Sequence, residues 1–138
     1  MIKLEHNWKT KTLSHLEKQK WNDSSFDSRL ILRLNQLRDI PLNTFTTEDL
    51  RIMIGQQMSL PYLIPLSIET LSINLFAEGD LFEGDLLKNV LSIETKFWNN
   101  NKEYWLQMND LIKHERDKIA KLKFDTSKFE NSIFKNLK

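Results

Sequence analysis

The central third of the chain decides its fold: it reads LRIMIGQQMSLPYLIPLSIETL at residues 50–71, AEGDLFEGDLLKNVL at residues 77–91 and FW at residues 97–98. All three glycines of the protein and two of its three prolines lie within this part of the sequence. Glycine adopts backbone conformations that other residues avoid, and proline fixes its own φ. Because the rest of the chain is nearly free of both, we expect plain helices on either side of a central segment with a more demanding shape.

Apolar residues recur at helical spacing along almost the whole sequence, and no alternating pattern of useful length indicates a strand. The spacing of Ser24 with Asp27, and of Thr46 with Asp49, is typical of a capping box at the start of a helix. The sequence therefore predicts an all-α protein, a single domain over residues 1–138 with about six to eight helices.

Further residues predict where helices begin and end. A first short helix is expected over residues 13–21, and the asparagines at 99–101 should separate two helices. A long helix with charged residues on its outer side follows over residues 105–122. Asp85 and Asp125 are each expected to cap the helix that follows them.

The helix expected after Ser59 is apolar on several sides, which is typical of a helix at the centre of a domain. Pro65 falls about one turn into it and should kink or restart it. In the preceding helix, Gly55 requires either the close approach of a neighbouring helix or an early helix end. One stripe of this central helix is formed by Leu60, Ile64, Ile68, Leu71 and Leu75, and other faces carry Leu63, Leu66 and Ile73.

Composition excludes several classes of function. The chain has 138 residues, 28% charged and 40% hydrophobic, which is the balance of an ordinary globular protein. A net charge of +1 argues against a dedicated nucleic-acid-binding domain. Without cysteine there are no disulfides, thiolate catalysis or common zinc sites. The longest uncharged span, residues 52–68, is shorter than the ~20 residues of a membrane-spanning helix. With no signal-peptide pattern at the N-terminus, we expect a cytoplasmic protein that does not bind membranes.

Charge is unevenly distributed along the sequence. The segment from Glu69 to Thr95 has six acidic residues and one lysine, a net charge of −5, whereas residues 96–138 have a net charge of +4. Such asymmetry can steer association with a basic partner. Alternatively, these acids are ordinary solvated residues of loops and of helix N-termini, where the helix dipole favours negative charge. The six acids are Glu69, Glu78, Asp80, Glu83, Asp85 and Glu94.

No residue set for ordinary catalysis is evident, so we expect no enzyme activity, no cofactor and no small-molecule substrate. Neither a GxSxG elbow nor a phosphate-binding glycine loop occurs. Asp110, His114 and Asp117 could share a helix face and hold a metal, but the neighbouring basic residues favour an ordinary solvated face. The acids at 78–85 could form a magnesium site or a carboxylate pair, although nothing in the pattern separates their pKa values.

The central segment resembles the contact-dependent growth inhibition (CDI) immunity proteins, over roughly residues 12–98. The family would have glycine where Ser59 stands and alanine where Ser67 stands. The residues that carry the resemblance are Leu50-Arg51, Ile54-Gly55-Gln56, Leu60, Leu63-Ile64-Pro65-Leu66, Glu69, Leu71, Gly84-Asp85-Leu86-Leu87, Val90-Leu91 and Phe97-Trp98.

The resemblance implies a cytoplasmic, non-enzymatic protein that binds, as a 1:1 complex, the C-terminal toxin domain of an effector delivered by neighbouring bacteria. These toxins are often nucleases, which present basic sites to phosphates. The hypothesis for the toxin-binding residues is therefore the acidic segment with one apolar anchor: Glu78, Asp80, Phe82, Glu83 and Asp85. The alternatives are a helical adaptor that binds a non-toxin protein and a small enzyme whose acids bind Mg²⁺.

Overall fold

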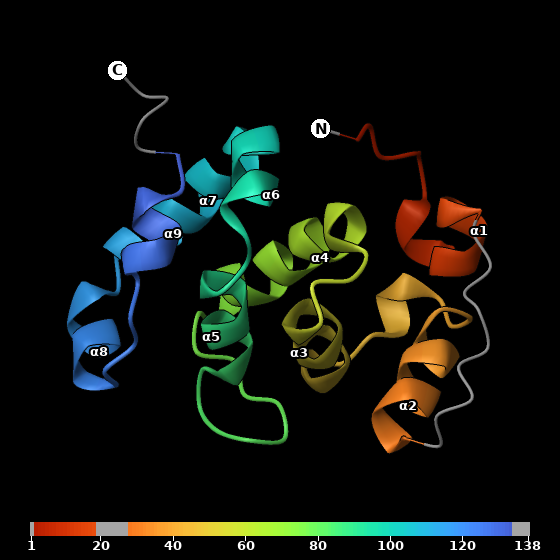
Figure 1. Ribbon diagram of the computed structural model, residues 1–138, viewed down its shortest axis with the longest axis horizontal. Helices are drawn as coiled ribbons and strands as arrows, with labels where there is room; N and C mark the ends of the chain where they lie inside the picture. The colour runs from red at the N-terminus through yellow and green to blue at the C-terminus, as the bar shows by residue number, and fades with distance from the viewer. Residues whose placement is uncertain (1, 19–27, 134–138) are drawn as a thin grey trace.

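Helices and the loops between them make up the parts of the chain that the structure, a computed structural model, describes: residues 2–18 and 28–133 (Figure 1). The predicted all-α class is confirmed. In chain order the elements are the 3₁₀ helix η1 (Trp8–Thr10), α1 (Leu13–Glu17), α2 (Arg29–Leu37), the 3₁₀ helix η2 (Leu42–Thr44), α3 (Thr47–Gly55), α4 (Leu60–Ile73), α5 (Asp85–Leu91), α6 (Thr95–Asn100), α7 (Lys102–Lys113), α8 (Arg116–Lys121) and α9 (Ser127–Asn131).

The described ranges hold nine α-helices, more than the six to eight expected, chiefly because the long charged helix is divided. It ends at Lys113 and a new helix begins at Arg116. Between the buried Ile112 and Ile119 the sequence has only polar and charged residues. Because no apolar side chain holds this stretch on the core, the chain can turn there.

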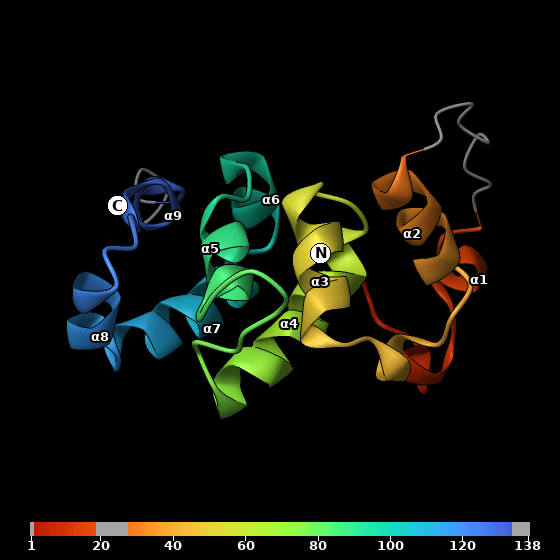
Figure 2. The ribbon, with the colours of Figure 1, turned by 90° about the horizontal axis from the view of Figure 1, so that it is seen from below.

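Helix α4 lies in the middle of the molecule, between the N-terminal helices and α7–α9 (Figure 1). It packs against α3 and α7, and α3 in turn packs against α5. The predicted stripe of α4 is buried, but Ile73 is 89% exposed, so its expected core position is wrong. The last turn of α4 lies at the edge of the molecule, where the neighbouring helices no longer cover it (Figure 2).

The start of α3 confirms the capping box predicted from Thr46 and Asp49. The Asp49 N–H donates to the Thr46 hydroxyl at 3.1 Å, and the Thr46 N–H donates to the Asp49 carboxylate at 3.0 Å. At the other end, α3 stops at Gly55, where an added Cβ would lie 2.9 Å from the amide nitrogen of Asn89 in α5. Both explanations for Gly55 therefore hold: the helix ends there and a neighbouring helix approaches closely.

Helix α4 begins after Ser59, whose backbone is left-handed with φ 55°. This is a conformation that glycine adopts more easily, and glycine is the residue that the family resemblance predicts there. Pro65 does not restart the helix, which continues to Ile73. The proline removes only one N–H from the helix, the one that would bind the carbonyl of Pro61.

Three other predicted boundaries differ from the structure. Helix α1 ends at Glu17, because Lys18 adopts a left-handed conformation with φ 54°; the expected end at Trp21 and the Ser24–Asp27 capping box lie outside the described residues. Ser28 caps α2 instead, accepting a bond from the Ile31 N–H at 3.3 Å. Helix α9 begins at Ser127, whose N–H does donate to the Asp125 carboxylate, at 2.9 Å, although Thr126 is the N-cap residue.

The predicted break at 99–101 is confirmed only at Asn101, which separates α6 from α7; Asn99 and Asn100 are the last residues of α6. Two tryptophans near this junction, Trp98 and Trp105, are buried and both contact Phe129, with ring centroids 5.1 and 5.2 Å apart. These aromatic contacts attach the C-terminal helix α9 to the core. None of the helices in the described ranges is long and apolar enough to cross a membrane.

Candidate functional site

The loop between α4 and α5, residues 74–84, projects from the lower side of the molecule as seen in Figure 1. Its base is fixed by Leu75, Phe76 and Ala77, which are all buried. The Gly84 N–H donates to the Phe76 carbonyl at 3.1 Å and closes the loop. Residues 78–83, called the loop tip below, contain four of the five predicted toxin-binding residues.

Asp85 lies beneath the loop tip and is only 2% exposed. Its carboxylate accepts hydrogen bonds from the N–H groups of Gly79 at 2.7 Å, Leu81 at 3.0 Å and Phe82 at 3.3 Å. The prediction that Asp85 caps α5 is wrong, because the N-cap residue is Gly84 and no side chain caps that helix. Asp85 organises the preceding loop instead.

Glu48 and Arg51 of α3 hold the loop from the other side. The Glu48 carboxylate accepts a hydrogen bond from the Asp80 N–H at 2.8 Å and two from the Arg51 guanidinium, the first from Nε at 2.6 Å. Arg51 Nε also lies 3.8 Å from the Asp85 carboxylate. Two carboxylates, from α3 and α5, therefore bind the four consecutive backbone N–H groups of residues 79–82.

The charges of this network are stabilised by their neighbours. Hydrogen bonding to Arg51 lowers the pKa of Glu48, and the same bond raises the pKa of Arg51. Burial by itself would raise the pKa of Asp85, but the three backbone N–H donors and Arg51 outweigh it, so the pKa is lowered. Both carboxylates are thus ionised at neutral pH, where their hydrogen bonds to the loop backbone are charge-assisted.

With its backbone bound from below, the loop tip presents its side chains outward. Glu78, Asp80 and Glu83 are exposed, and Phe82 is 38% exposed. Asp85 is separated from these four because its carboxylate is buried and fully used by the loop.

One apolar residue of the loop tip was missed by sequence reasoning: Leu81, which is 64% exposed. The sequence feature that could have identified Leu81 is the apolar pair Leu81-Phe82, which lies between the two acid-glycine-acid turns. Exposed leucine and phenylalanine side chains side by side in sequence are unusual for a loop that is otherwise so acidic. They give the loop tip both an apolar centre and a charged surround, the composition of a protein-binding surface.

Two lysines neighbour the loop tip. Lys118 of α8 pairs with Glu83 at 2.9 Å, with both side chains partly exposed, and the Lys88 ammonium lies 5.4 Å from the Phe82 ring centroid. The carboxylates of Glu78 and Asp80 form no ion pair with any residue in the described ranges. The loop tip therefore retains uncompensated negative charge.

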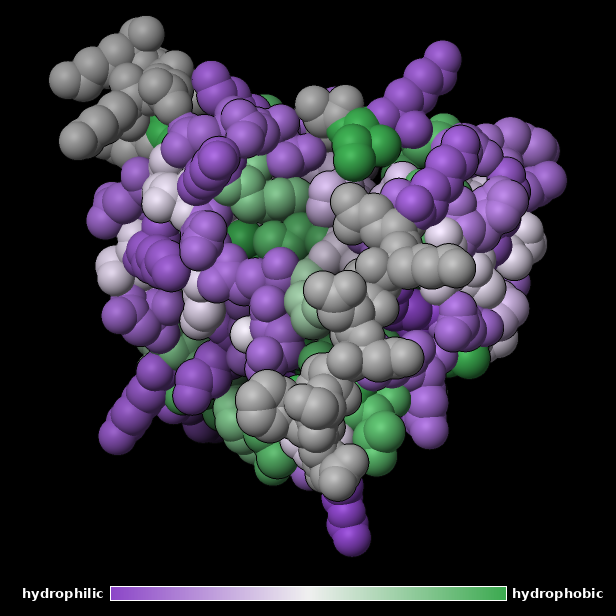
Figure 3. Space-filling view, turned by 45° about the vertical axis from the view of Figure 1, so that its right-hand side comes forward, coloured by the Kyte–Doolittle hydropathy of each residue, from purple (hydrophilic) through white to green (hydrophobic). Residues whose placement is uncertain are grey.

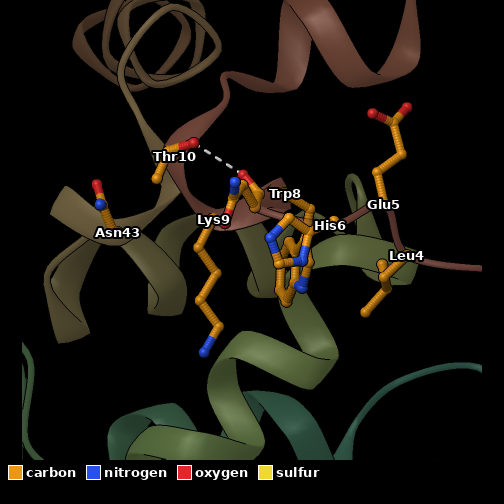
Figure 4. Close-up of a pocket in the computed structure, with 8 residues that line it drawn as sticks. Leu4, Glu5, His6, Trp8, Lys9, Thr10 and Asn43 are labelled. Atoms are coloured by element: carbon orange, nitrogen blue, oxygen red, sulfur yellow. Dashed lines mark hydrogen bonds between the residues drawn. The ribbon is translucent and has the colours of Figure 1, made fainter.

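An open cavity of about 760 Å³ lies at the N-terminus, lined by residues 4–10 and Asn43 (Figure 4). Two of its polar side chains are engaged within the fold: the Thr10 hydroxyl donates to the Asn7 carbonyl at 2.8 Å, and Lys9 extends to α4, where it binds Glu69 at 2.6 Å. His6 is not in hydrogen-bond contact with a carboxylate in the part of the chain described, so no acid–base pair forms there.

The possible metal ligands Asp110, His114 and Asp117 do not share one helix, because the chain turns between α7 and α8. His114 Nδ1 instead lies 2.7 Å from the Asp110 carbonyl oxygen. Across residues 2–18 and 28–133, no group of three or more potential metal-binding side chains comes together. On the face shown in Figure 3, hydrophilic residues predominate and hydrophobic ones emerge in separate small areas.

The described ranges thus form an all-α fold with an exposed loop of acidic and apolar residues whose backbone is bound by Glu48 and Asp85. The chain belongs to the family of CDI immunity proteins, whose family model matches residues 15–108. The match extends from α1 into α7 and includes the whole α4–α5 loop. Family membership indicates a toxin-neutralising immunity function with a cognate toxin as the partner. No curated protein matches the chain.

Proposed function

We propose that this chain protects the cytoplasm of its cell by binding the cognate toxin domain in a 1:1 complex, as a single domain without catalytic activity of its own. The toxin is a nuclease, and the loop tip is part of the surface that binds it. Family membership supports the immunity function. The nuclease target and the use of the loop are inferences from the charge and shape of the loop.

The observation that carries this proposal is the position of Leu81 and Phe82, both exposed and surrounded by Glu78, Asp80 and Glu83 on a backbone held by Glu48 and Asp85. A nuclease site must attract phosphates, so its basic groups complement this acidic surround. The two apolar side chains supply the anchors that dominate binding energy in protein interfaces. A rigid loop also loses little conformational entropy when it binds.

Calorimetric titration with the toxin domain encoded just upstream of this chain's gene tests the proposal. We expect 1:1 binding in the nanomolar range or tighter, about −12 kcal/mol. Phe82→Ala and Leu81→Ala should each weaken binding about tenfold or more, as expected for anchor residues. Leu106→Ala is a matched control, because Leu106 is also exposed, at 54%, but lies on α7 away from the loop.

Charge reversal tests the electrostatic part of the proposal. Glu78→Lys and Asp80→Lys should weaken binding and reduce its dependence on salt, whereas Glu103→Lys on α7 should have little effect at 0.5 M NaCl, where exposed charges are screened. Unchanged affinity and salt dependence in the loop variants would exclude the loop as the binding surface. A folded, active toxin that does not bind would exclude immunity, and a toxin that leaves DNA and RNA intact would exclude a nuclease target.

A further inference from the structure

A second concave surface adjoins the loop tip. It is a groove of about 330 Å³ between residues 71–76, at the C-terminal end of α4, and the junction of α7 with α8. Lys118 connects it to the loop: this lysine lines the groove, pairs with Glu83 of the loop tip and lies 4.6 Å from the ring centroid of Phe76. The groove and the loop tip therefore share an edge.

The C-terminal end of α4 gives the groove a negative polarity. Helix α4 has 14 residues and no basic residue in its last turn. Among the described residues, no hydrogen bond is donated to the carbonyls of Leu71, Ser72 and Ile73. The last carbonyls of a helix attract cations, because the peptide dipoles leave about half a negative charge at that end.

The side chains around the groove add to this polarity. Glu115 is exposed and forms no ion pair within the described ranges. Lys118, the cation of the groove, is already bound to Glu83 and placed over the Phe76 ring. His114 turns Nδ1 to the Asp110 carbonyl. One uncompensated carboxylate and one helix C-terminus therefore face whatever enters the groove.

Apolar side chains line part of the groove, between its polar and charged residues. Leu111 lines it from α7, and Ile73, at 89% the most exposed of the large hydrophobic residues described, lies at its α4 side. A cationic side chain on an aliphatic stem matches such a surface, because the stem packs on apolar residues while the head meets carbonyl and carboxylate oxygens. The volume is sufficient for one long side chain.

We propose that the groove receives a single arginine or lysine side chain of the toxin, next to the contacts made by the loop tip. This inference rests on the proposed function, because the partner is the same toxin domain. It assigns a second contact with its own chemistry: an aliphatic stem between Ile73 and Leu111, and a cationic head at the Glu115 carboxylate and the C-terminal carbonyls of α4.

Two matched pairs of variants test the groove, with the dissociation constant for the upstream-encoded toxin measured in 0.15 M and 0.5 M NaCl. Glu115→Lys places a cation at the groove and should weaken binding about tenfold at both salt concentrations, as for a close charge pair. Glu103→Lys makes the same charge change near the start of α7 and should match the unaltered protein in 0.5 M NaCl. Ile73→Ser should weaken binding several-fold, whereas Leu106→Ser should not. Thermal unfolding confirms that each variant is folded.

The outcomes separate this inference from the proposed function. Suppose that the toxin binds and that Phe82→Ala weakens this binding, but that Glu115→Lys and Ile73→Ser bind the toxin as their controls do. The groove is then not a contact, and the loop proposal stands. If Glu115→Lys and Ile73→Ser weaken binding while the loop variants do not, the groove is the contact and the loop proposal fails. A toxin that does not bind at all overturns both.

Discussion

The carboxylate of Asp85 accepts a hydrogen bond from the backbone N–H of Gly79 at 2.7 Å, six residues earlier in the chain. Asp85 occupies the first turn of α5, so this bond ties the projecting α4–α5 loop to a core helix. Together with the bond from the Asp80 N–H to Glu48, it makes the loop conformation part of the fold. The backbone that carries the side chains proposed to bind the toxin is thus held in place by the fold itself.

Replacement of Asp85 by asparagine should destabilise the protein. An asparagine keeps one acceptor oxygen, but its NH₂ group would face backbone N–H groups that now donate to the carboxylate. A buried donor without an acceptor costs about 1–3 kcal/mol, so the free energy of unfolding in Asp85→Asn should fall by about that amount. Urea denaturation at pH 7 measures it.

Asp80→Asn is the matched control, because the Asp80 side chain is exposed and only its backbone N–H binds Glu48. Its free energy of unfolding should stay within about 0.5 kcal/mol of the unaltered protein. Equal stability of the two variants would contradict the role assigned to the Asp85 carboxylate.

The stability of the protein should fall in acid because of the same network. The pKa values of Glu48 and Asp85 lie below their ordinary values of 4.5 and 3.8, so the unfolded chain takes up protons at a higher pH than the folded one does. The contribution of these two carboxylates to the stability of the folded protein is therefore complete above about pH 5. It is lost as the pH falls through the lowered pKa values.

The Asp85→Asn variant isolates one part of this pH dependence. Residue 85 no longer titrates in the variant, so the difference in free energy of unfolding between the two proteins should narrow from pH 7 to pH 3. Urea denaturation across this range measures the difference, and Asp80→Asn again serves as control. A difference that stays constant with pH would show that Asp85 does not titrate with a lowered pKa.

Gly79→Ala should destabilise the loop by overpacking. A Cβ at this position would lie 2.5 Å from a carboxylate oxygen of Glu48 and 3.3 Å from the Glu48 Cα, so rotation of the glutamate side chain alone does not relieve the contact. Overpacking of this kind costs about 1–3 kcal/mol. Gly55→Ala is the comparison, because its Cβ meets only the end of the Asn89 side chain and alanine favours the helix. Thermal or urea unfolding should rank Gly79→Ala as clearly less stable; the reverse order would be inconsistent with the packing described.

Local sequence patterns predicted the local features of the fold. The Thr46–Asp49 capping box joins two residues that are three positions apart, and its geometry follows from the sequence alone. The role of Asp85 could not be predicted in this way. An aspartate at the start of a helix indicates a cap, and only the course of the loop decides that its carboxylate turns to residues 79–82.

Contacts between residues distant in the sequence could not be predicted either. Glu48 and Asp80 are 32 residues apart, and no periodicity connects a glutamate in α3 with a backbone N–H in the α4–α5 loop. The exposure of Ile73 depends on where α4 extends past its neighbours, which its own hydrophobicity does not reveal. The sequence therefore predicted the acidic loop as a candidate site but not the network that shapes it.

Ser67→Ala should stabilise the protein. Ser67 lies on α4 and is fully buried, and its hydroxyl has no hydrogen-bond partner in the described part of the molecule. Alanine is also the residue expected here from the family resemblance. Removing an unsatisfied buried hydroxyl should raise the free energy of unfolding by about 1 kcal/mol.

Helix propensity also favours alanine over serine, so the control must be on the same helix. Ser72→Ala serves this purpose, because Ser72 is an exposed residue of α4 whose hydroxyl donates to the Glu69 carbonyl. Urea denaturation should show a larger gain for Ser67→Ala than for Ser72→Ala. A gain equal to that of the control would mean that the buried hydroxyl carries no penalty, and a loss would mean that it has a partner inside the core.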